Sequence, residues 1–493
     1  MISFIDVFHS VPLIILLICG LLLMLADGFK LHKMLPSLAG VGILLSAILS
    51  YLFNYSEEMS PLYNGMIYFG GLASIIHIFL CLSGVFALFF IPDYLKRFQE
   101  DIGEVYALVT FSLIGMIMMA TANDLIIIFI GLEVFSICLY IMAGLFRKQI
   151  QSTEAGLKYF LLGAFASAFL LYGMALLYGI SGTTNLKNLI EIDYATLHDS
   201  IVFYPAIGLI LVGYLFKTAA FPFHAWTPDV YTGAPTPLAG FMATASKFAV
   251  FISLTFLLYF LKIIPTGETA LSNGKFIAVL GMLAFLSMLY GNIVAAQQTN
   301  VKRILAYSSI AHTGYIFLGL CAGAQAFEAV MFYLVVYVLM TIGAFGVIAL
   351  LENKFNDNEL DTFKGLGQKN PMLAMLMSIF LFSLAGIPPL AGFMGKYQVF
   401  LAAIQAKQTL LAVLGILTSV IGAYYYIRII MVMYFQKPVE SQTVLDPIRT
   451  TATTPVVALA VIAALVILLG VYPSVIMNSI DTLYNLSFSI ASR

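Results

Sequence analysis

Residues 214–229 read YLFKTAAFPFHAWTPD, an apolar segment in which one lysine and two prolines interrupt what would otherwise be a helix. Proline removes a helical hydrogen bond and clashes with the carbonyl one turn earlier. Residues 383–396, SLAGIPPLAGFMGK, combine a lysine with two prolines in the same way. Because backbone groups freed at membrane depth must be lined by protein or water, both segments predict broken membrane helices with a lysine beside the break.

The whole chain has the composition of an integral membrane protein. Of its 493 residues, 61% are hydrophobic and 10% are charged, whereas soluble domains carry about 25% charge. The net charge of −1 excludes a nucleic-acid binder and a strongly basic lipid-surface protein. Apolar runs of roughly 20 residues, the length that crosses a bilayer, recur from end to end. We therefore expect one all-α integral membrane domain over residues 1–493, with about 14 transmembrane helices.

The order of the expected helices predicts two inverted repeats. The broken helices are the seventh and the twelfth, and because they are five helices apart, a five-helix repeat must be inverted in the membrane. The first repeat, helices 4–8, covers about residues 105–262, and the second, helices 9–13, covers about residues 275–435. Helices 1–3 precede them in about residues 1–104, and helix 14 follows in about residues 454–478.

The distribution of Lys and Arg predicts the orientation of the chain. Thirteen of these residues fall in the odd-numbered loops, Lys302 and Lys364 among them, and five fall on the opposite side. Cytoplasmic loops of membrane proteins carry the excess of positive charge. The odd-numbered loops are therefore expected in the cytoplasm and both termini in the periplasm.

Four ionisable side chains are expected deep in the bilayer, where such groups cost several kcal/mol and indicate function by default. Glu133 and Lys247 each lie nine to ten residues into a helix, roughly 14–15 Å deep at 1.5 Å per residue. Lys217 and Lys396 flank the two helix breaks. The alternative is a structural role, as a hydrogen-bonded carboxylate for Glu133 and as caps of freed carbonyls for the two flanking lysines.

Further polar residues are weaker candidates. Lys158 lies about one turn inside its helix and could extend its amine to the membrane interface. His224 and His312 could relay protons near neutral pH, although a structural histidine fits the sequence equally well. The residues expected at the interface are Arg428, Trp226 and Asp229.

The signs of the deep charges separate two mechanisms. A sodium or potassium path uses oxygen ligands and several carboxylates, and lysine amines would repel the ion. Lysine amines carry protons only if they titrate; burial favours the neutral amine, and a neighbouring carboxylate favours the charged one. A buried Glu–Lys pair beside further lysines therefore predicts a proton switch.

No cofactor site and no metal site are expected in this chain. The sequence has no Gly-rich phosphate loop and no dinucleotide-binding fingerprint. Its six histidines are scattered, and its four cysteines lie in apolar runs without metal or redox spacing, as buried thiols do. We expect no redox chemistry in this chain.

Five stretches together resemble one family of membrane proteins. They are residues 131–144 (GLEVFSICLYIMAG), 153–167 (TEAGLKYFLLGAFAS), 216–237, 301–315 (VKRILAYSSIAHTGY) and 386–393 (GIPPLAGF). The set is similar to the antiporter-like membrane subunits of bacterial NADH-quinone oxidoreductase (respiratory complex I), and among these to the N type. The likeness extends over nearly the whole chain.

The resemblance implies a line of buried charges that joins two proton half-channels. In that family the fifth-helix glutamate pairs with the seventh-helix lysine, which here are Glu133 and Lys217. The central lysine of the eighth helix corresponds to Lys247. The twelfth-helix residue is a lysine in N and L types and a glutamate in M types, and here it is Lys396. Quinone reduction in other subunits would drive the protons, so the chain would be a translocase subunit of the enzyme.

The resemblance also implies partners and a compartment. The partners would be an M-type subunit on one side and the small A, J and K subunits on the other, within the lipid bilayer of a bacterial inner membrane. FMN, iron–sulfur clusters and quinone would belong to other subunits.

Two alternatives share the fold: a subunit of a multi-subunit monovalent cation/proton antiporter, and a subunit of a related ferredoxin- or hydrogenase-linked complex. The excess of deep lysines favours the quinone-reducing complex over the antiporter. A purely structural scaffold would leave these lysines unexplained.

Overall fold

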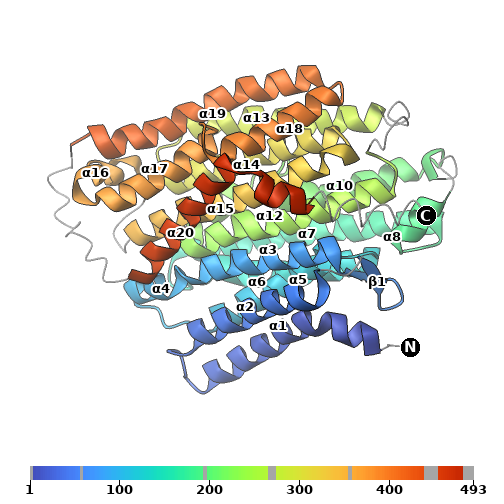
Figure 1. The fold of residues 1–493 in the computed structure, drawn as a ribbon, viewed down its shortest axis with the longest axis horizontal. Helices are drawn as coiled ribbons and strands as arrows, with labels where there is room; N and C mark the ends of the chain where they lie inside the picture. The colour runs from blue at the N-terminus through green and yellow to red at the C-terminus, as the bar shows by residue number, and fades with distance from the viewer. Residues whose placement is uncertain are drawn as a thin grey trace.

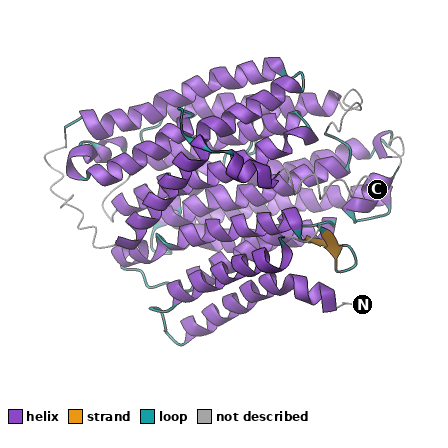
Figure 2. Cartoon of the chain, viewed as in Figure 1, coloured by secondary structure: helices purple, strands orange, loops and turns teal. Residues whose placement is uncertain are grey.

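The chain folds almost entirely into helices, with one short hairpin of strands at one end (Figure 1 and Figure 2). The computed structural model describes residues 4–55, 59–192, 197–264, 274–352, 358–437 and 453–480. The elements before the first break are α1 (Phe4–Gly28), α2 (Leu35–Asn54), β1 (Ser60–Leu62), β2 (Ile67–Phe69), α3 (Gly71–Leu88), α4 (Ile91–Phe98), α5 (Glu104–Ala120), α6 (Leu125–Ala143), α7 (Ile150–Ser181), α8 (Leu186–Glu191) and α10 (Phe203–Thr218). Those after it are α11 (Thr227–Gly233), α12 (Thr236–Phe260), α13 (Gly274–Gln297), α14 (Val301–Cys321), α15 (Phe327–Leu351), α16 (Leu366–Lys369), α17 (Pro371–Ala385), α18 (Ala391–Gln405), α19 (Thr409–Phe435) and α20 (Thr453–Val471).

The described residues include eleven helices that are long and apolar enough to cross a membrane, and α5, α10 and α17 are shorter apolar helices. The long helices run in broadly one direction, with α4 and α16 at one end of the bundle and β1 and α8 at the other (Figure 1). The all-α membrane class is confirmed, and the count of about 14 helices stays a prediction. The expected positions of the two chain ends, Met1 and Arg493, lie outside the described residues.

Three helices form the centre of the bundle. The membrane-spanning windows of α12, α14 and α15 are entirely buried, whereas only 33% of the windows of α1, α2 and α19 is buried. A helix that is apolar all round belongs in the interior of a large protein or in a membrane. Any polar side chain on the central helices is therefore enclosed by protein.

Both expected helix interruptions are present in the backbone. At the first, α10 ends at Thr218, and Ala219 adopts a left-handed conformation with φ of 58° before the chain reaches α11. At the second, α17 ends at Ala385, and Gly386 has φ of 87° before α18 begins. A left-handed residue after the last turn is a common helix ending. Each break thus separates two helical segments that each need their free backbone groups satisfied.

Several helix pairs pack with their backbones in contact, and two of them hold matching places in the expected repeats. A Cβ atom on Gly115 of α5 would lie 2.7 Å from the carbonyl oxygen of Gly131 on α6. A Cβ atom on Gly291 of α13 would lie 2.6 Å from the backbone nitrogen of Ala311 on α14. Small residues allow such close approach between membrane helices. The pairs α5–α6 and α13–α14 occupy the first two places of the two expected repeats.

Candidate functional site

The carbonyl groups freed at the first helix break are hydrogen-bonded by buried side chains. Trp226 Nε1 donates to the carbonyl of Phe216 at 3.0 Å. Thr313 Oγ1, from the central helix α14, donates to the carbonyl of Thr218 at 2.7 Å. Because an unpaired carbonyl in a membrane costs several kcal/mol, these contacts stabilise the broken helix.

Lys217, in the last turn of α10, lies inside a cage of aromatic rings. It is 2% exposed, and its Nζ donates a hydrogen bond to the Tyr140 hydroxyl at 3.0 Å. The same nitrogen lies 4.7 to 5.7 Å from the centroids of four rings: Phe135, Tyr140, Tyr159 and Phe216. Aromatic ring faces attract an ammonium group. The cage therefore accommodates a cation without a carboxylate in contact with it.

Glu133 does not contact Lys217 directly, which corrects the expected ion pair. No nitrogen–oxygen contact within 4.0 Å joins the two side chains in the described part of the chain, and Glu133 Oε1 is buried there without a hydrogen-bond partner. Glu133 interacts electrostatically with both Lys217 and Tyr140. Tyr140 lies seven residues after Glu133, two turns along nearly the same face of α6. The amine is turned toward the tyrosine, and Glu133 acts on both groups through its charge.

Lys247 is fully buried on α12 and all three of its ammonium hydrogens have acceptors. Its Nζ donates to the Ser309 carbonyl at 2.8 Å, to Ser309 Oγ at 2.6 Å and to Thr313 Oγ1 at 2.8 Å. The Tyr337 hydroxyl of α15 also donates to Ser309 Oγ, at 2.9 Å. The site is therefore built from one residue of α12, two of α14 and one of α15, and none of these partners is a carboxylate.

One threonine connects the Lys247 site with the first helix break. Thr313 accepts the hydrogen bond from Lys247 and donates to the carbonyl of Thr218, the residue next to Lys217. A hydroxyl both donates and accepts hydrogen bonds, so it can link two polar groups. The two lysine sites are thus joined through the backbone of the broken helix.

His312 lies beside this connection and has hydroxyl partners at both ring nitrogens. Its Nδ1 is 2.6 Å from the Tyr333 hydroxyl, and its Nε2 is 3.1 Å from the Tyr426 hydroxyl. The ring is 1% exposed. In a neutral imidazole one nitrogen donates and the other accepts, so the ring links the hydroxyls of α15 and α19.

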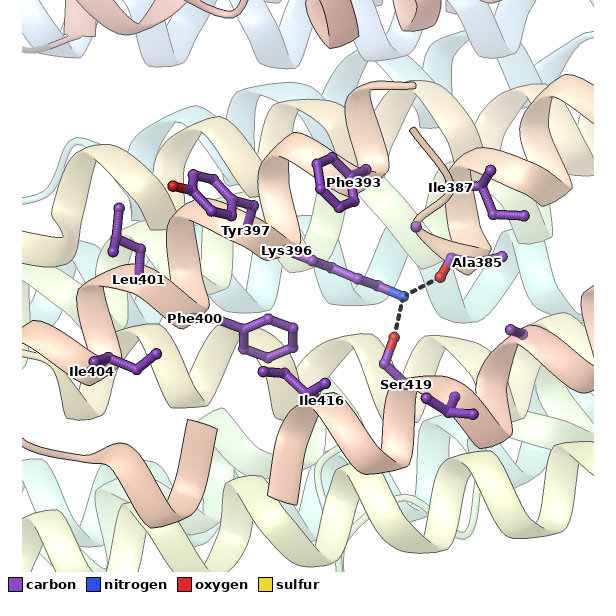
Figure 3. Close-up of a pocket in the computed structure, with 13 residues that line it drawn as sticks. Ala385, Ile387, Phe393, Lys396, Tyr397, Phe400, Leu401, Ile404, Ile416 and Ser419 are labelled. Atoms are coloured by element: carbon purple, nitrogen blue, oxygen red, sulfur yellow. Dashed lines mark hydrogen bonds between the residues drawn. The ribbon is translucent and has the colours of Figure 1, made fainter. Parts of the chain in front are cut away.

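Lys396, on α18, caps the second helix break and faces a cavity (Figure 3). Its Nζ donates to the carbonyls of Leu384 and Ala385, each at 3.0 Å, and to Ser419 Oγ at 2.9 Å. The amine also lies 5.1 Å from the centroid of the Tyr315 ring. The cavity has a volume of about 500 Å³, and its other walls are mostly apolar side chains of α18 and α19. The expected carbonyl-capping contacts are present, so Lys396 has a structural contact as well as a position beside a cavity.

Amide and hydroxyl groups connect the surroundings of Lys396 with His312. The Asn292 side-chain nitrogen donates to the Tyr315 hydroxyl, and the Tyr425 hydroxyl donates to the Asn292 oxygen, each at 3.0 Å. The rings of Tyr425 and Tyr426 are 4.4 Å apart, and Tyr426 contacts His312. A chain of polar side chains thus extends from the first break to the second.

Lys158 belongs to a different cluster at one end of the bundle. Its Nζ lies 2.6 Å from Glu154 and 2.9 Å from Asp229, and Arg303 also contacts Asp229 at 2.9 Å. Burial alone would raise the pKa of the Asp229 carboxyl, but the hydrogen bonds from Lys158 and Arg303 outweigh it and hold this pKa below its ordinary value. Lys158 is therefore an ion-paired lysine that is not bonded to the central chain of polar groups.

The packing gives three other residues contacts that the sequence did not show. His224 is buried against the rings of Phe221 and Tyr290, and its Nδ1 has no hydrogen-bond partner in the described ranges. Arg428 donates to backbone carbonyls at the end of α13, where it caps that helix. Trp226 was expected at the interface but is 3% exposed and stacks on a ring of the Lys217 cage. The sequence could not show this because the ring it meets comes from α7.

Sequence reasoning did not single out the hydroxyl groups that hold the lysines. They are the hydroxyls of Tyr140, Ser309, Thr313 and Ser419; the rings of Tyr315 and Tyr337 lie 5.1 Å and 6.0 Å from Lys396 Nζ and Lys247 Nζ. For α14 a signal was available, since Ser309, His312 and Thr313 recur at the three- and four-residue spacing of one helical face. Within the described residues no group of three or more His, Cys, Asp or Glu side chains could hold a metal ion.

Comparisons with known proteins agree on one family. The family model described as NADH:quinone oxidoreductase/Mrp antiporter, TM matches residues 122–422. NADH-quinone oxidoreductase subunit N from Salinibacter ruber is 41% identical over 463 residues, 92% of this chain and 91% of that protein. A chain of respiratory complex I from Thermus thermophilus superimposes with a TM-score of 0.79 at 32% identity, covering 95% of this chain and 98% of that chain. A chain of the Mrp complex from Dietzia has a TM-score of 0.82 at 19% identity, covering 99% and 98%, which shows a shared fold.

Proposed function

The chain belongs to the NADH:quinone oxidoreductase/Mrp antiporter family of membrane subunits, and we propose that it is the N-type, proton-translocating subunit of an NADH-quinone oxidoreductase. The observation that carries this proposal is the chain of buried polar groups through Lys217, Lys247 and Lys396. Enclosed ionisable groups at membrane depth are costly and typical of ion and proton paths. The names of the relatives favour this function over the antiporter and the ferredoxin- or hydrogenase-linked alternatives.

In this mechanism, each lysine amine holds a proton among neutral oxygen acceptors and passes it to the next group. Tyr140 accepts a hydrogen bond from Lys217, and the charge of Glu133 acts on the amine through space and controls whether the amine keeps its proton. Thr313 offers an acceptor to Lys247 next to the Lys217 segment. The hydroxyls can hand on one proton while they take up another. Protons would therefore cross between two half-channels along the centre of the bundle.

The two half-channels correspond to the two proposed five-helix repeats, about residues 105–262 and 275–435. The matching glycine contacts in α5–α6 and α13–α14 support this division. So does the presence in each half of one helix break with a lysine beside it, Lys217 in the first half and Lys396 in the second. Redox centres and quinone would belong to other subunits, and the proposed partners are M-type, A, J and K subunits in a bacterial inner membrane.

The proposed function is tested by deleting the gene for this chain and restoring it in the source bacterium. NADH-driven proton uptake into inside-out membrane vesicles should disappear on deletion and return with the native chain. Peripheral iron–sulfur subunits should co-purify with a tagged copy in mild detergent. Unchanged NADH-driven proton uptake, together with loss of sodium- or potassium-driven proton exchange, would instead identify an antiporter subunit.

Labelling of engineered cysteines tests the proposed orientation. A cysteine in place of Gln368, on α16, should be protected in intact cells from a maleimide that cannot cross the membrane, because this end is proposed to be cytoplasmic. A cysteine in place of Asn188, exposed on α8 at the opposite end of the bundle, should react. The four native cysteines are buried and give little background. The reverse labelling pattern would contradict the proposed direction of both half-channels.

A further inference from the structure

A buried lysine–carboxylate pair in direct contact lies at the α4 and α16 end of the bundle. Lys302 Nζ is 3.6 Å from Glu352 Oε1, and the two residues are 2% and 7% exposed. Lys302 was expected in a cytoplasmic loop, but it is the second residue of α14 and lies inside the protein. Two charges removed from solvent are stable only with good geometry and further hydrogen bonds.

The Glu352 carboxylate collects those hydrogen bonds from separate parts of the fold. The Tyr94 hydroxyl of α4 donates to Oε2 at 3.1 Å, and the Asn358 side chain donates to Oε1 at 2.7 Å. Thr236 Oγ1, the first residue of α12, also donates to Oε2. The carboxylate therefore ties α4 and α12 to the end of α15.

Lys302 and Arg97 extend the same connection. Lys302 Nζ donates to the carbonyl of Ala234, which lies immediately before α12, at 3.0 Å. Arg97 of α4 donates to the carbonyls of Leu350 at 2.7 Å and Glu352 at 2.9 Å. Lys302, Glu352 and Arg97 face each other at this end together with Tyr94, and Asp93 acts on Arg97 from the same helix. The hydrogen bonds and the ion pair of these groups join the ends of α12, α14 and α15.

The three helices joined at this end are the three that build the Lys247 site. Lys247 itself is on α12, its acceptors Ser309 and Thr313 are on α14, and Tyr337 is on α15. The helices lie next to one another at the centre of Figure 1. At 1.5 Å per residue, Lys247 is about 17 Å along α12 from Thr236. The pair therefore lies away from the lysine relay but at the shared end of its scaffold.

We propose that Lys302 and Glu352 are positioning residues that fix the axial register of α12, α14 and α15, and so hold Lys247 against its acceptors. A helix moves along its axis as a rod, so a shift at its first turn is carried to Lys247. The hydrogen bonds of Lys247 are 2.6 to 2.8 Å long, and such bonds weaken steeply beyond about 3.2 Å. A shift of about 1 Å would therefore change how Lys247 exchanges its proton. The expected effect on pumping rests on the proposed function, whereas the expected effect on the helix register is independent of it.

Arginine distinguishes a positioning lysine from a relay lysine. A guanidinium keeps its positive charge at any accessible pH and cannot release a proton. If Lys302 only holds Glu352 and Ala234, Lys302→Arg keeps the required charge and donors, whereas Lys302→Met removes both. Glu352→Gln keeps the shape of the carboxylate and removes its charge. The matched control is Lys364→Met, which breaks the more exposed pair of Lys364 with Asp361 at 2.9 Å.

The first measurement detects a shift of α12 against its neighbours from the labelling rate of a cysteine, without any transport assay. Ser246→Cys places a thiol next to Lys247, at a buried position that bonds only to its own helix carbonyl among the described residues. In membranes that contain the assembled complex, we expect N-ethylmaleimide to label this cysteine about threefold or more faster when Lys302→Met or Glu352→Gln is added. Lys302→Arg and Lys364→Met should leave the labelling slow. Equal labelling in all variants would overturn the proposal, whatever the chain transports.

The second measurement uses the same variants without the reporter cysteine. Per assembled complex, Lys302→Met and Glu352→Gln should lower the ratio of protons pumped to NADH oxidised by about threefold or more and shift the pH profile of that ratio. Lys302→Arg should reproduce the native profile. If arginine is as damaging as methionine, Lys302 is itself a relay residue and the positioning role is wrong. Loss of pumping with a native pH profile would also contradict it.

Discussion

Replacement of Lys247 by arginine is expected to stop proton pumping while the chain still assembles with its partners. The amine of Lys247 has three acceptors for its three hydrogens, and all three acceptors are neutral. An ammonium in this setting can give up its proton, but a guanidinium cannot. A positioned acid–base group contributes roughly 10²–10⁴-fold to a rate, so pumping should fall at least tenfold.

The larger guanidinium also brings five donors to a site with acceptors for three. Each buried donor without a partner costs roughly 1–3 kcal/mol, so Lys247→Arg alone could fail by misfolding. Lys247→Met removes the charge at nearly constant length and should assemble normally, with the same loss of pumping. Lys275→Arg, at an exposed position of α13, is the matched control and should pump normally.

The measurement is the ratio of protons pumped to NADH oxidised in inside-out vesicles, with assembly checked on native gels. Loss with both Lys247 variants supports a lysine that must exchange a proton. Native pumping with arginine and loss with methionine would mean that the position needs only a fixed charge. In that case Lys247 is not the central relay.

The features that single residues determine were predictable from the sequence. The breaks after Thr218 and Ala385 follow from prolines in apolar segments, because proline removes a helical hydrogen bond and clashes with the preceding turn. The burial of Lys247 follows from its depth in an uninterrupted apolar run, because a lysine there cannot reach either surface. These conclusions depend on local sequence and on the membrane, and need no knowledge of tertiary contacts.

The features that depend on distant residues were not predictable. Lys302 looks like a loop lysine because it begins a helix, and its partner Glu352 is 50 residues further along the chain. Tyr140 looks like an ordinary aromatic core residue until α10 brings Lys217 to its hydroxyl. The burial of Trp226 was not predictable either, since its stacking partner lies on another helix, α7. Partner choice in the core is set by packing between helices, which helical periodicity does not encode.

Neutralisation of Glu133 is expected to stop proton uptake as completely as removal of the Lys217 amine. The two side chains are not in contact, so they act as one unit through their charges, while the Tyr140 hydroxyl is bonded to the Lys217 amine. A close opposite charge changes the cost of ionisation by roughly 1.5–4 kcal/mol. Moving one proton against a potential of about 150 mV costs roughly 3.5 kcal/mol. The two energies match, so motion of Glu133 toward or away from Lys217 could gate one proton per cycle.

Four variants and one control test this unit. Glu133→Gln and Lys217→Ala should each reduce pumping at least about tenfold, as loss of a positioned acid–base group would. The double variant should be little worse, because residues of one unit are not additive. Tyr140→Phe removes only the linking hydroxyl and should give a smaller loss, since the charges still act through space. Glu191→Gln, which neutralises an exposed carboxylate at the end of α8, should pump normally.

The result of the double variant decides between two arrangements. If Glu133 and Lys217 serve separate steps, their losses multiply and the double variant falls well below either single one. If they form one switch, the second substitution removes nothing that the first left in place. Native pumping by Glu133→Gln would exclude the switch altogether. Because Glu133 Oε1 lacks a hydrogen-bond partner within the described ranges, its substitution by glutamine removes the charge at little cost in contacts, so assembly on native gels should be unchanged.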